Sequence, residues 1–191
     1  MEDFQGGWIM MITGGMYAGK SEELTRTMRR FSHAQKIGVI FKPKVDTRSG
    51  DDCVTTHNGG KMKAVVVDSV AGIRLYLDEH KDEPLDVVAI DEAQFLETDE
   101  LLILAKELAM HGISVVIAAL DKKWDGTHFK GVGDLLAEAD IDKRLHAICA
   151  YCGHLASHSL RVSSSTADIE VGDDYKPVCR SCFNKAMAQR A

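Results

Sequence analysis

The sequence predicts an α/β fold, in which a parallel sheet is flanked by helices and followed by a small cysteine-bearing unit. Three observations support this prediction. Short apolar runs alternate with amphipathic runs as far as about residue 147, as expected for parallel strands buried on both faces. A glycine-rich turn, Gly14–Ser21, joins the first such strand to the first helix. After residue 147, short strands and two Cys-x-x-Cys pairs replace this rhythm, so we predict two domains, residues 1–147 and 148–191.

The composition limits the kinds of partner that the chain can have. Its 191 residues, 45% of them hydrophobic and 27% charged, are enough for one well-buried core and a small appendage. The formal net charge is −6, and no cluster of lysine and arginine stands out, so the chain lacks the basic face that polymeric nucleic acid requires. We find neither a signal peptide nor an apolar run long enough to span a membrane. We therefore expect a cytoplasmic protein with no membrane partner.

The glycine-rich turn has the spacing of a phosphate-binding loop, in which a glycine and four further residues precede Gly-Lys-Ser. Its members are Gly14, Gly15, Met16, Tyr17, Ala18, Gly19, Lys20 and Ser21. An apolar strand over residues 8–12 precedes the loop, and a helix to about residue 34 follows it. Glycines allow several N–H groups to approach phosphate oxygens, and the positive end of the helix faces the same anion. The loop predicts a bound nucleoside triphosphate, with Lys20 at the β- and γ-phosphates and Ser21 on Mg²⁺.

The segments after the first helix continue the alternation of strands and helices. Apolar runs bounded by polar, glycine or proline residues predict strands, and i, i+3, i+4, i+7 spacing predicts helices. The predicted strands cover residues 36–41, 64–67, 85–90, 113–120 and 144–149. The predicted helices cover residues 70–80, 98–111 and 133–139. We predict loops for the polar stretch up to residue 60 and for residues 121–133.

Two carboxylates, Asp91 and Glu92, directly follow a predicted apolar strand. Ligands of open α/β sheets bind at the carboxyl ends of the strands. The first acid is placed to hold Mg²⁺ together with Ser21, and the second to accept a proton from an attacking nucleophile. The pair therefore indicates phosphoryl transfer. It leaves the acceptor open, because water would make the chain an ATPase and a hydroxyl group would make it a kinase.

The two Cys-x-x-Cys pairs are Cys149 with Cys152 and Cys179 with Cys182. In a reducing compartment, this spacing predicts a structural Zn²⁺ held by four thiolates and not a disulfide framework. A thioredoxin-like redox pair is the alternative, but the βαβ context of such a pair is absent. A site of this kind supplies on the order of 10 kcal/mol of folding free energy. His154 and His158 are spare donors for the metal, but we expect them to be surface residues. We expect the fifth cysteine, Cys53, to be an inert thiol.

Three aromatic residues lie in or near predicted loops. Trp124, Phe129 and Tyr175 together could form an apolar slot for a flat base, although each alone is also compatible with simple packing. Arg48 and Arg161 are candidates for contact with a phosphate or carboxylate, and solvated surface positions are the alternative for both.

Taken in order, these motifs resemble one family, the type II thymidine kinases, and the resemblance covers nearly the whole chain. The residues that carry it are Gly14–Ser21, Asp46–Arg48, Thr56-His57, Ile90–Phe95, Ala118–Asp121 and the two cysteine pairs. The resemblance implies a RecA-like domain with a phosphate-binding loop and a zinc-bearing lasso domain. It also implies transfer of the γ-phosphoryl group of ATP to the 5′-hydroxyl of thymidine. The predicted cofactors are therefore ATP, Mg²⁺ and a structural Zn²⁺.

The resemblance also implies roles for individual residues. Glu92 is the implied general base. The implied nucleotide-binding residues are Gly14 to Ser21, Asp46, Thr47, Arg48, Asp91, Ala93 and Gln94, with Ser21 and Asp91 as Mg²⁺ ligands. The implied thymidine-binding residues are Phe95, Leu120, Trp124, Phe129, Ser159, Ile169, Glu170, Val171, Gly172 and Tyr175. In this family, main-chain groups of the lasso, here about Ile169 to Gly172, clamp the base.

Two departures from the family pattern concern the nucleoside site. Trp124 stands where the family commonly has phenylalanine, and the lasso around Gly172 is shorter than usual. Family members are homotetramers that are inhibited by thymidine triphosphate, dTTP, so both properties are implied here.

Two other classes of protein compete with the kinase interpretation. The run Asp91–Gln94 resembles a helicase box, but such motors usually need two nucleotide-binding lobes and a basic face. A non-catalytic nucleotide sensor would keep Lys20 but would have no need for Glu92.

Overall fold

The computed structural model describes residues 6–45, 53–55, 61–163 and 174–190. Its centre is a six-stranded sheet with the order β5-β2-β6-β7-β1-β8 and parallel pairing throughout. The strands are β1 (Ile9–Thr13), β2 (Gly38–Pro43), β5 (Val65–Val67), β6 (Val87–Ile90), β7 (Ser114–Ala119) and β8 (Ile141–Arg144). The predicted parallel α/β sheet is thus confirmed. Because every strand runs in the same direction, all carboxyl ends meet at one edge of the sheet.

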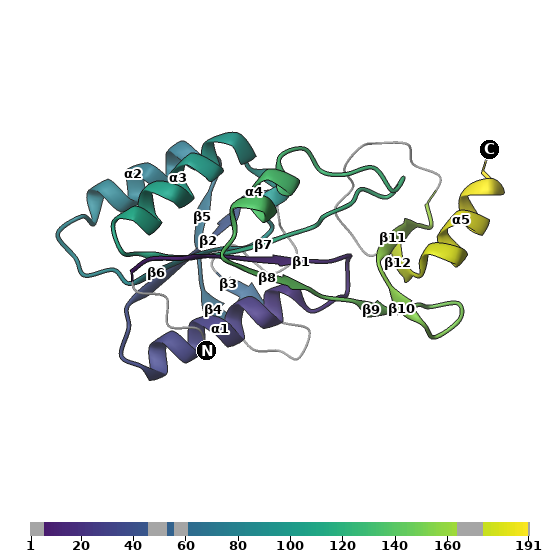
Figure 1. The fold of residues 1–191 in the computed structure, drawn as a ribbon, viewed down its shortest axis with the longest axis horizontal. Helices are drawn as coiled ribbons and strands as arrows, with labels where there is room; N and C mark the ends of the chain where they lie inside the picture. Colours follow the sequence, from purple (N-terminus) through teal and green to yellow (C-terminus); the bar gives the residue numbers. More distant parts are fainter. Residues whose placement is uncertain (1–5, 46–52, 56–60, 164–173, 191) are drawn as a thin grey trace.

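Helices cover both faces of this sheet (Figure 1). On one face lies α1 (Lys20–His33). The other face carries α2 (Val70–Glu79), α3 (Thr98–Met110) and α4 (Val132–Glu138). Alternate residues of β1 enter two separate cores, because Met10 and Ile12 pack under α1 whereas Ile9 and Met11 pack with the residues of α2 to α4. This burial on both faces explains why the central strands are apolar throughout.

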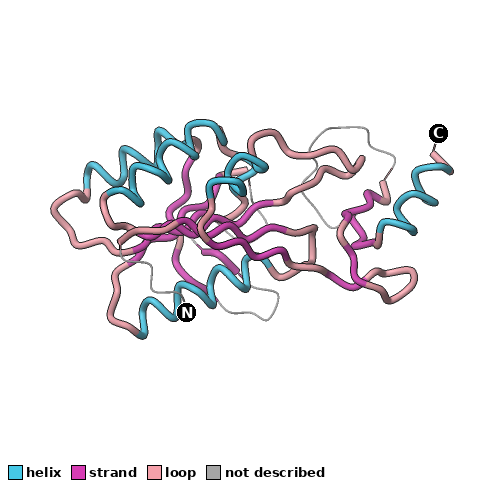
Figure 2. The backbone as a smooth tube through the Cα atoms, viewed as in Figure 1, coloured by secondary structure: helices cyan, strands magenta, loops and turns pink. Residues whose placement is uncertain are grey.

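A smaller unit lies beyond the carboxyl ends of β1 and β8, where Figure 2 shows short strands and one terminal helix. It contains the antiparallel pairs β9 (Ala147–Ile148) with β10 (Leu155–Ala156) and β11 (His158–Arg161) with β12 (Tyr175–Val178), followed by α5 (Arg180–Ala188). It has an apolar cluster of its own, and Ala18 of the glycine-rich loop packs against that cluster. The loop and the C-terminal unit are therefore in direct contact.

The structure differs from the sequence prediction at three places. The edge strand β8 covers 141–144, not 144–149, and its half-exposed polar residues hide it from a search for apolar runs. The strand β3 (Cys53–Thr55) lies within the segment that we predict as a loop, and it pairs with β4 (Lys61–Lys63), which lies just before the predicted strand 64–67. The sequence prediction also lacks α5, because its N-cap is Cys179, whose sulfur accepts from the Cys182 N–H in place of a serine or aspartate oxygen.

Within the described ranges, no helix combines the length and the apolar character that crossing a membrane would need.

Candidate active site and metal centre

The glycine-rich loop has the backbone that a phosphate-binding loop needs. Gly14 has φ of +148°, and a Cβ there would lie 2.4 Å from the carbonyl oxygen of Leu145. Gly19 has φ of +84° and is the N-cap of α1, so the first helical residue is Lys20. Both glycines are thus required by conformation or by close approach. The buried Lys20 donates from Nζ to the carbonyl oxygen of Gly15 over 3.0 Å, which places its charge over the loop.

The first carboxylate after β6 lies beside this loop. Asp91 is buried, and its carboxylate is hydrogen-bonded to the hydroxyl of Ser21. Burial raises the pKa of Asp91 to about 7, and the charge of Glu92 adds to this effect, whereas Ser21 and Lys20 act in the opposite direction. A hydroxyl and a carboxylate oxygen are suitable ligands for Mg²⁺, and a divalent cation would offset the burial of the ionised acid. These two residues therefore fit the predicted magnesium site.

The second carboxylate is held by a glutamine. Glu92 is buried and adopts the left-handed conformation, with φ of 49° and ψ of 39°. Gln94 donates from Nε2 to Glu92 Oε2 over 2.5 Å, and its Oε1 accepts from the N–H of Leu120 over 2.9 Å. Because a non-glycine residue in this region stores conformational energy, the position is typical of a functional site. The left-handed backbone at Glu92 ends the extended path of β6, and Gln94 links the Glu92 carboxylate to Leu120 at the end of β7.

The predicted thymidine-binding residues lie in different surroundings. The hydroxyl of Ser159 accepts from the N–H of Met16 over 2.9 Å, so the C-terminal unit is hydrogen-bonded to the glycine-rich loop. Trp124 and Tyr175 both lie close to the guanidinium of Arg161, with ring centres 4.8 Å and 5.5 Å from its central carbon. Phe129, by contrast, is partly buried against the main core.

Part of the predicted site lies outside the described residues. These positions are Asp46, Thr47 and Arg48 on the nucleotide side, with Thr56-His57, and Ile169, Glu170, Val171 and Gly172 on the lasso side. Their roles stay predictions.

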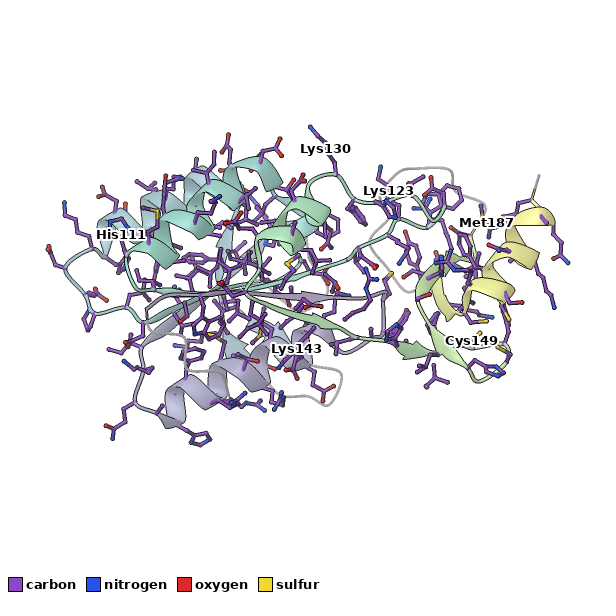
Figure 3. All side chains as sticks on the ribbon, in the orientation of Figure 1. His111, Lys123, Lys130, Lys143, Cys149 and Met187 are labelled. Carbon is purple, nitrogen blue, oxygen red and sulfur yellow. The ribbon has the colours of Figure 1, made fainter. Side chains whose placement is uncertain are left out.

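The four paired cysteines form one cluster at the end of the C-terminal unit, and Figure 3 labels Cys149 beside α5. Their sulfur atoms all lie within 4.8 Å of one another, and Cys152 Sγ is 3.6 Å from Cys179 Sγ. A tetrahedron of thiolates about 2.3 Å from a zinc ion has edges of roughly 3.8 Å, so the cluster fits Zn²⁺. The N–H of Cys182 also points to Cys179 Sγ, 3.5 Å away, as expected for a thiolate ligand.

The two neighbouring histidines differ from each other. His154 is exposed, as predicted, and its Nδ1 lies 3.3 Å from Cys152 Sγ. The prediction that His158 is a surface residue is wrong, because only 5% of it is exposed and its ring stacks on Phe183 with centroids 4.5 Å apart. Burial, together with the charges of Lys122 and Arg180, lowers the pKa of His158 and favours its neutral form.

One charged cluster at the carboxyl edge contains none of the predicted site residues. The buried Asp121 Oδ2 lies 2.8 Å from Lys122 Nζ and 3.1 Å from Arg144 Nη2, so it connects the ends of β7 and β8. Asp121 comes two residues after the end of the apolar strand β7, much as Asp91 comes directly after β6. An acid at the carboxyl end of an apolar strand is therefore the sequence signal that could have identified Asp121. Its partner Arg144 could not be assigned from sequence, because the predicted strand begins at residue 144, where β8 ends.

Comparison with known proteins decides the family. The model of the family described as thymidine kinase matches residues 7–183. The chain belongs to the thymidine kinase family. A thymidine kinase of Bacteroides thetaiotaomicron is 40% identical over 185 residues, which are 96% of this chain and 90% of that protein. A thymidine kinase of Bacteroides fragilis strain YCH46 is 38% identical over 185 residues, which are again 96% of this chain and 90% of that protein.

Membership of the thymidine kinase family confirms the resemblance found in the sequence. It supports the predicted activity, the phosphorylation of thymidine by ATP. Among solved structures, the genome packaging NTPase B204 from Sulfolobus turreted icosahedral virus 2 aligns with a TM-score of 0.49 and 14% identity, covering 75% of this chain and 76% of that one. The family assignment rests on the match to the family model and on the two Bacteroides relatives.

Proposed function

We propose that this chain transfers the γ-phosphoryl group of ATP to the 5′-hydroxyl of thymidine, giving thymidine monophosphate and ADP. The observation that carries the mechanism is that two adjacent acids, Asp91 and Glu92, have different hydrogen-bond partners. The Asp91 carboxylate is hydrogen-bonded to Ser21 of the glycine-rich loop, whereas the Glu92 carboxylate accepts a hydrogen bond from Gln94. One acid is thus placed for the metal and the other for the acceptor hydroxyl.

The donor side uses the loop and the start of α1. Lys20 exchanges its hydrogen bond to the Gly15 carbonyl for phosphate oxygens, while the loop N–H groups and the positive end of α1 face the same charge. Ser21 and Asp91 would hold Mg²⁺, which when bound neutralises charge on the phosphoryl oxygens. Asp46, Thr47, Arg48 and Ala93 complete this side by resemblance to the family.

On the acceptor side, Glu92 accepts the proton of the 5′-hydroxyl as that oxygen forms a bond to the γ-phosphorus. The bond from this phosphorus to the bridging oxygen breaks, and its electron pair leaves with ADP. Gln94 keeps the Glu92 carboxylate oriented throughout, since it is itself anchored to Leu120. The lasso main chain around Ile169–Gly172 clamps the base. The residues proposed around the nucleoside are Phe95, Leu120, Trp124, Phe129, Ser159 and Tyr175.

Three further properties belong to the proposal. Residues 1–147 bind ATP and residues 148–191 form the zinc-bearing lasso domain. dTTP inhibits by placing its nucleoside in the thymidine site and its phosphates on the glycine-rich loop. The working form is a cytoplasmic homotetramer, which light scattering of the purified chain would test.

A product assay tests the proposed reaction. With Mg-ATP, we expect monophosphate from thymidine and little from deoxyadenosine, with deoxyuridine and deoxycytidine defining the breadth of the base site. ADP release without any nucleoside would instead identify an ATPase, and release only with single-stranded DNA would identify a DNA-dependent motor. ATP binding without turnover would identify a nucleotide sensor.

Substitution of Glu92 tests the assignment of the base. Glu92→Gln should lower kcat by about 10²- to 10⁴-fold, the usual contribution of a general base, and leave ATP binding intact. Glu100→Gln, at an exposed position in the first turn of α3, is the matched control. Turnover in Glu92→Gln equal to that of the control would exclude Glu92 as the base.

A further inference from the structure

Arg161 is fully buried and lies in contact with two aromatic rings. It lies on β11 directly opposite Tyr175 of β12, and 0% of it is exposed. Its guanidinium donates to the Tyr175 hydroxyl from Nη2 over 2.9 Å and from Nε over 3.2 Å. The guanidinium carbon is 4.8 Å from the centre of the Trp124 ring and 5.5 Å from that of the Tyr175 ring. One side chain therefore contacts both rings.

The two rings belong to different parts of the fold. Tyr175 is in the C-terminal unit, whereas Trp124 lies in the loop between β7 and α4 of the main domain. That loop is seated on the C-terminal unit, because a Cβ at Gly126 would lie 3.0 Å from the ring of Phe183. Lys122 Nζ also lies 3.4 Å from the carbonyl oxygen of Ser157. Arg161 thus spans a junction between two units that are already packed together.

The chemistry of arginine suits this bridging position. Its guanidinium is planar, so one face can stack on an indole while its edge donates two hydrogen bonds to a single hydroxyl. Cation–π attraction is strongest where water is excluded, as it is around Arg161. A guanidinium of Arg190 in turn donates to the carbonyl oxygen of Arg161, which fastens the backbone of β11 to the end of α5.

We propose that Arg161 is a positioning residue for the nucleoside: it holds Trp124 and Tyr175 in place as walls of the base site and thereby sets the affinity for thymidine. The inference rests on the proposed function, in which these two rings face the base. It gives Arg161 a role different from the phosphate contact considered from the sequence. Because the rings contact the base and not the reacting phosphorus, loss of Arg161 should raise the KM for thymidine and leave kcat and the KM for ATP nearly unchanged.

Steady-state kinetics of two Arg161 variants test the proposal. Arg161→Met removes the charge and the donors and should raise the thymidine KM about tenfold. Arg161→Lys keeps a charge without the planar fork and should give a smaller rise, about threefold. Arg180→Met, at an exposed arginine of α5, is the matched control and should behave as the wild type. Zinc content, measured for every variant, identifies any that fails to fold, and Arg161→Lys then carries the test.

A second measurement reports on the rings themselves. The chain has two tryptophans, Trp8 and Trp124, so in a Trp8→Phe background the emission comes from Trp124 alone. Replacing Arg161 should change this emission, and Tyr175→Phe should change it in the same direction by loosening the guanidinium. Adding thymidine should shift the Trp124 emission in the Trp8→Phe chain. The same shift should need a higher thymidine concentration in the Arg161 variants.

The two proposals fail in distinguishable ways. If the wild type phosphorylates thymidine but zinc-loaded Arg161 variants keep its KM within about twofold, the positioning role is wrong and the proposed function stands. A parallel rise in the KM for ATP would also overturn the positioning role, since it would place the effect on the phosphates or on the whole fold. If the wild type does not phosphorylate thymidine, both the proposed function and the positioning role of Arg161 are wrong.

Discussion

The side-chain amide of Gln94 donates to the carboxylate of Glu92 over 2.5 Å. The other end of the same amide accepts from the backbone N–H of Leu120 over 2.9 Å. Because the N–H of Leu120 can bond only an acceptor, the amide has one orientation, with its NH₂ group toward Glu92. The strained turn after β6 is thus connected to β7, the strand that lies between β6 and the loop-bearing β1.

Gln94→Leu should lower kcat by about 10- to 100-fold, because Glu92 keeps its carboxylate but loses the group that orients it. The family resemblance implies a nucleotide-binding role for Gln94, but its side-chain hydrogen bonds go to Glu92 and Leu120 and not to Lys20 or Ser21, so the KM for ATP should change little. Steady-state kinetics with thymidine and ATP varied separately measure both effects. Gln189→Leu, at an exposed position near the C-terminus, serves as the control. An unchanged kcat in Gln94→Leu would show that Glu92 is oriented by other contacts.

The parts of the fold that the sequence predicts well are those in which local pattern and tertiary structure agree. The run from Ile9 to Thr13 is buried throughout, and glycines at 14 and 19 have the positive φ values that the loop spacing requires. The same agreement holds for Asp91 and Glu92, which directly follow a strand buried throughout its length. Backbone conformation and strand direction are sufficient to bring these groups to one edge of the sheet.

The contacts that the sequence does not predict depend on long-range register. In the sequence, α4, β8 and the hairpin β9–β10 lie between Trp124 and Arg161, so the contact of these two side chains depends on how the C-terminal unit docks on the main domain. The link between Gln94 and Leu120 similarly depends on β6 pairing with β7. No local periodicity reports either distance. The partial polarity of β8 has the same origin, because only its position at the sheet edge permits half-exposed residues.

Two glycines near the start of α4 should respond oppositely to substitution by alanine. At Gly131, φ is +72° and a Cβ would lie 2.0 Å from Thr98 Oγ1, so Gly131→Ala should destabilise the fold by about 2 to 4 kcal/mol. At Gly133, within α4, a Cβ would meet nothing within 4 Å, so Gly133→Ala should stabilise it by about 0.5 to 1 kcal/mol. Urea unfolding with zinc held constant measures both free energies. Equal effects of the two changes would contradict the conformation assigned to Gly131.

Removal of one zinc ligand should affect thymidine and ATP differently. Cys179→Ser should abolish binding of the one zinc ion per chain that native mass spectrometry is expected to find in the wild type. Loss of the metal removes on the order of 10 kcal/mol of folding free energy from the C-terminal unit. Thymidine phosphorylation should then be lost while ATP binding is retained, because the phosphate-binding loop joins β1 to α1 in the main domain and not in the C-terminal unit. Cys53→Ser, which changes the one cysteine that belongs to neither Cys-x-x-Cys pair, is the control. A folded, active and metal-free Cys179→Ser protein would rule out a structural zinc site.

The ion pairs of Glu23 should make stability depend on pH in the acid range. Glu23 Oε1 lies 2.7 Å from Arg26 Nη2 and 2.6 Å from Lys143 Nζ, so it joins α1 to β8 (Figure 3 labels Lys143). The hydrogen bond from Arg26 and then the contacts of Lys143 lower the pKa of Glu23 from 4.5 to about 2, although burial opposes them. The folded state therefore binds the proton less tightly than the unfolded state.

The sign of this effect follows from the lowered pKa. The stabilisation is fully present above pH 4.5 and disappears as the pH falls from about 4.5 to 2. Glu23→Gln should thus cost about 1 kcal/mol at pH 7, a value reduced by solvent screening because 56% of the Arg26 side chain is exposed. Acid also protonates the cysteine cluster, so urea midpoints of wild type and variant are compared at each pH, with the exposed Glu22→Gln as control. A difference between wild type and Glu23→Gln that stays constant from pH 7 to pH 3 would mean that the two ion pairs do not stabilise the fold.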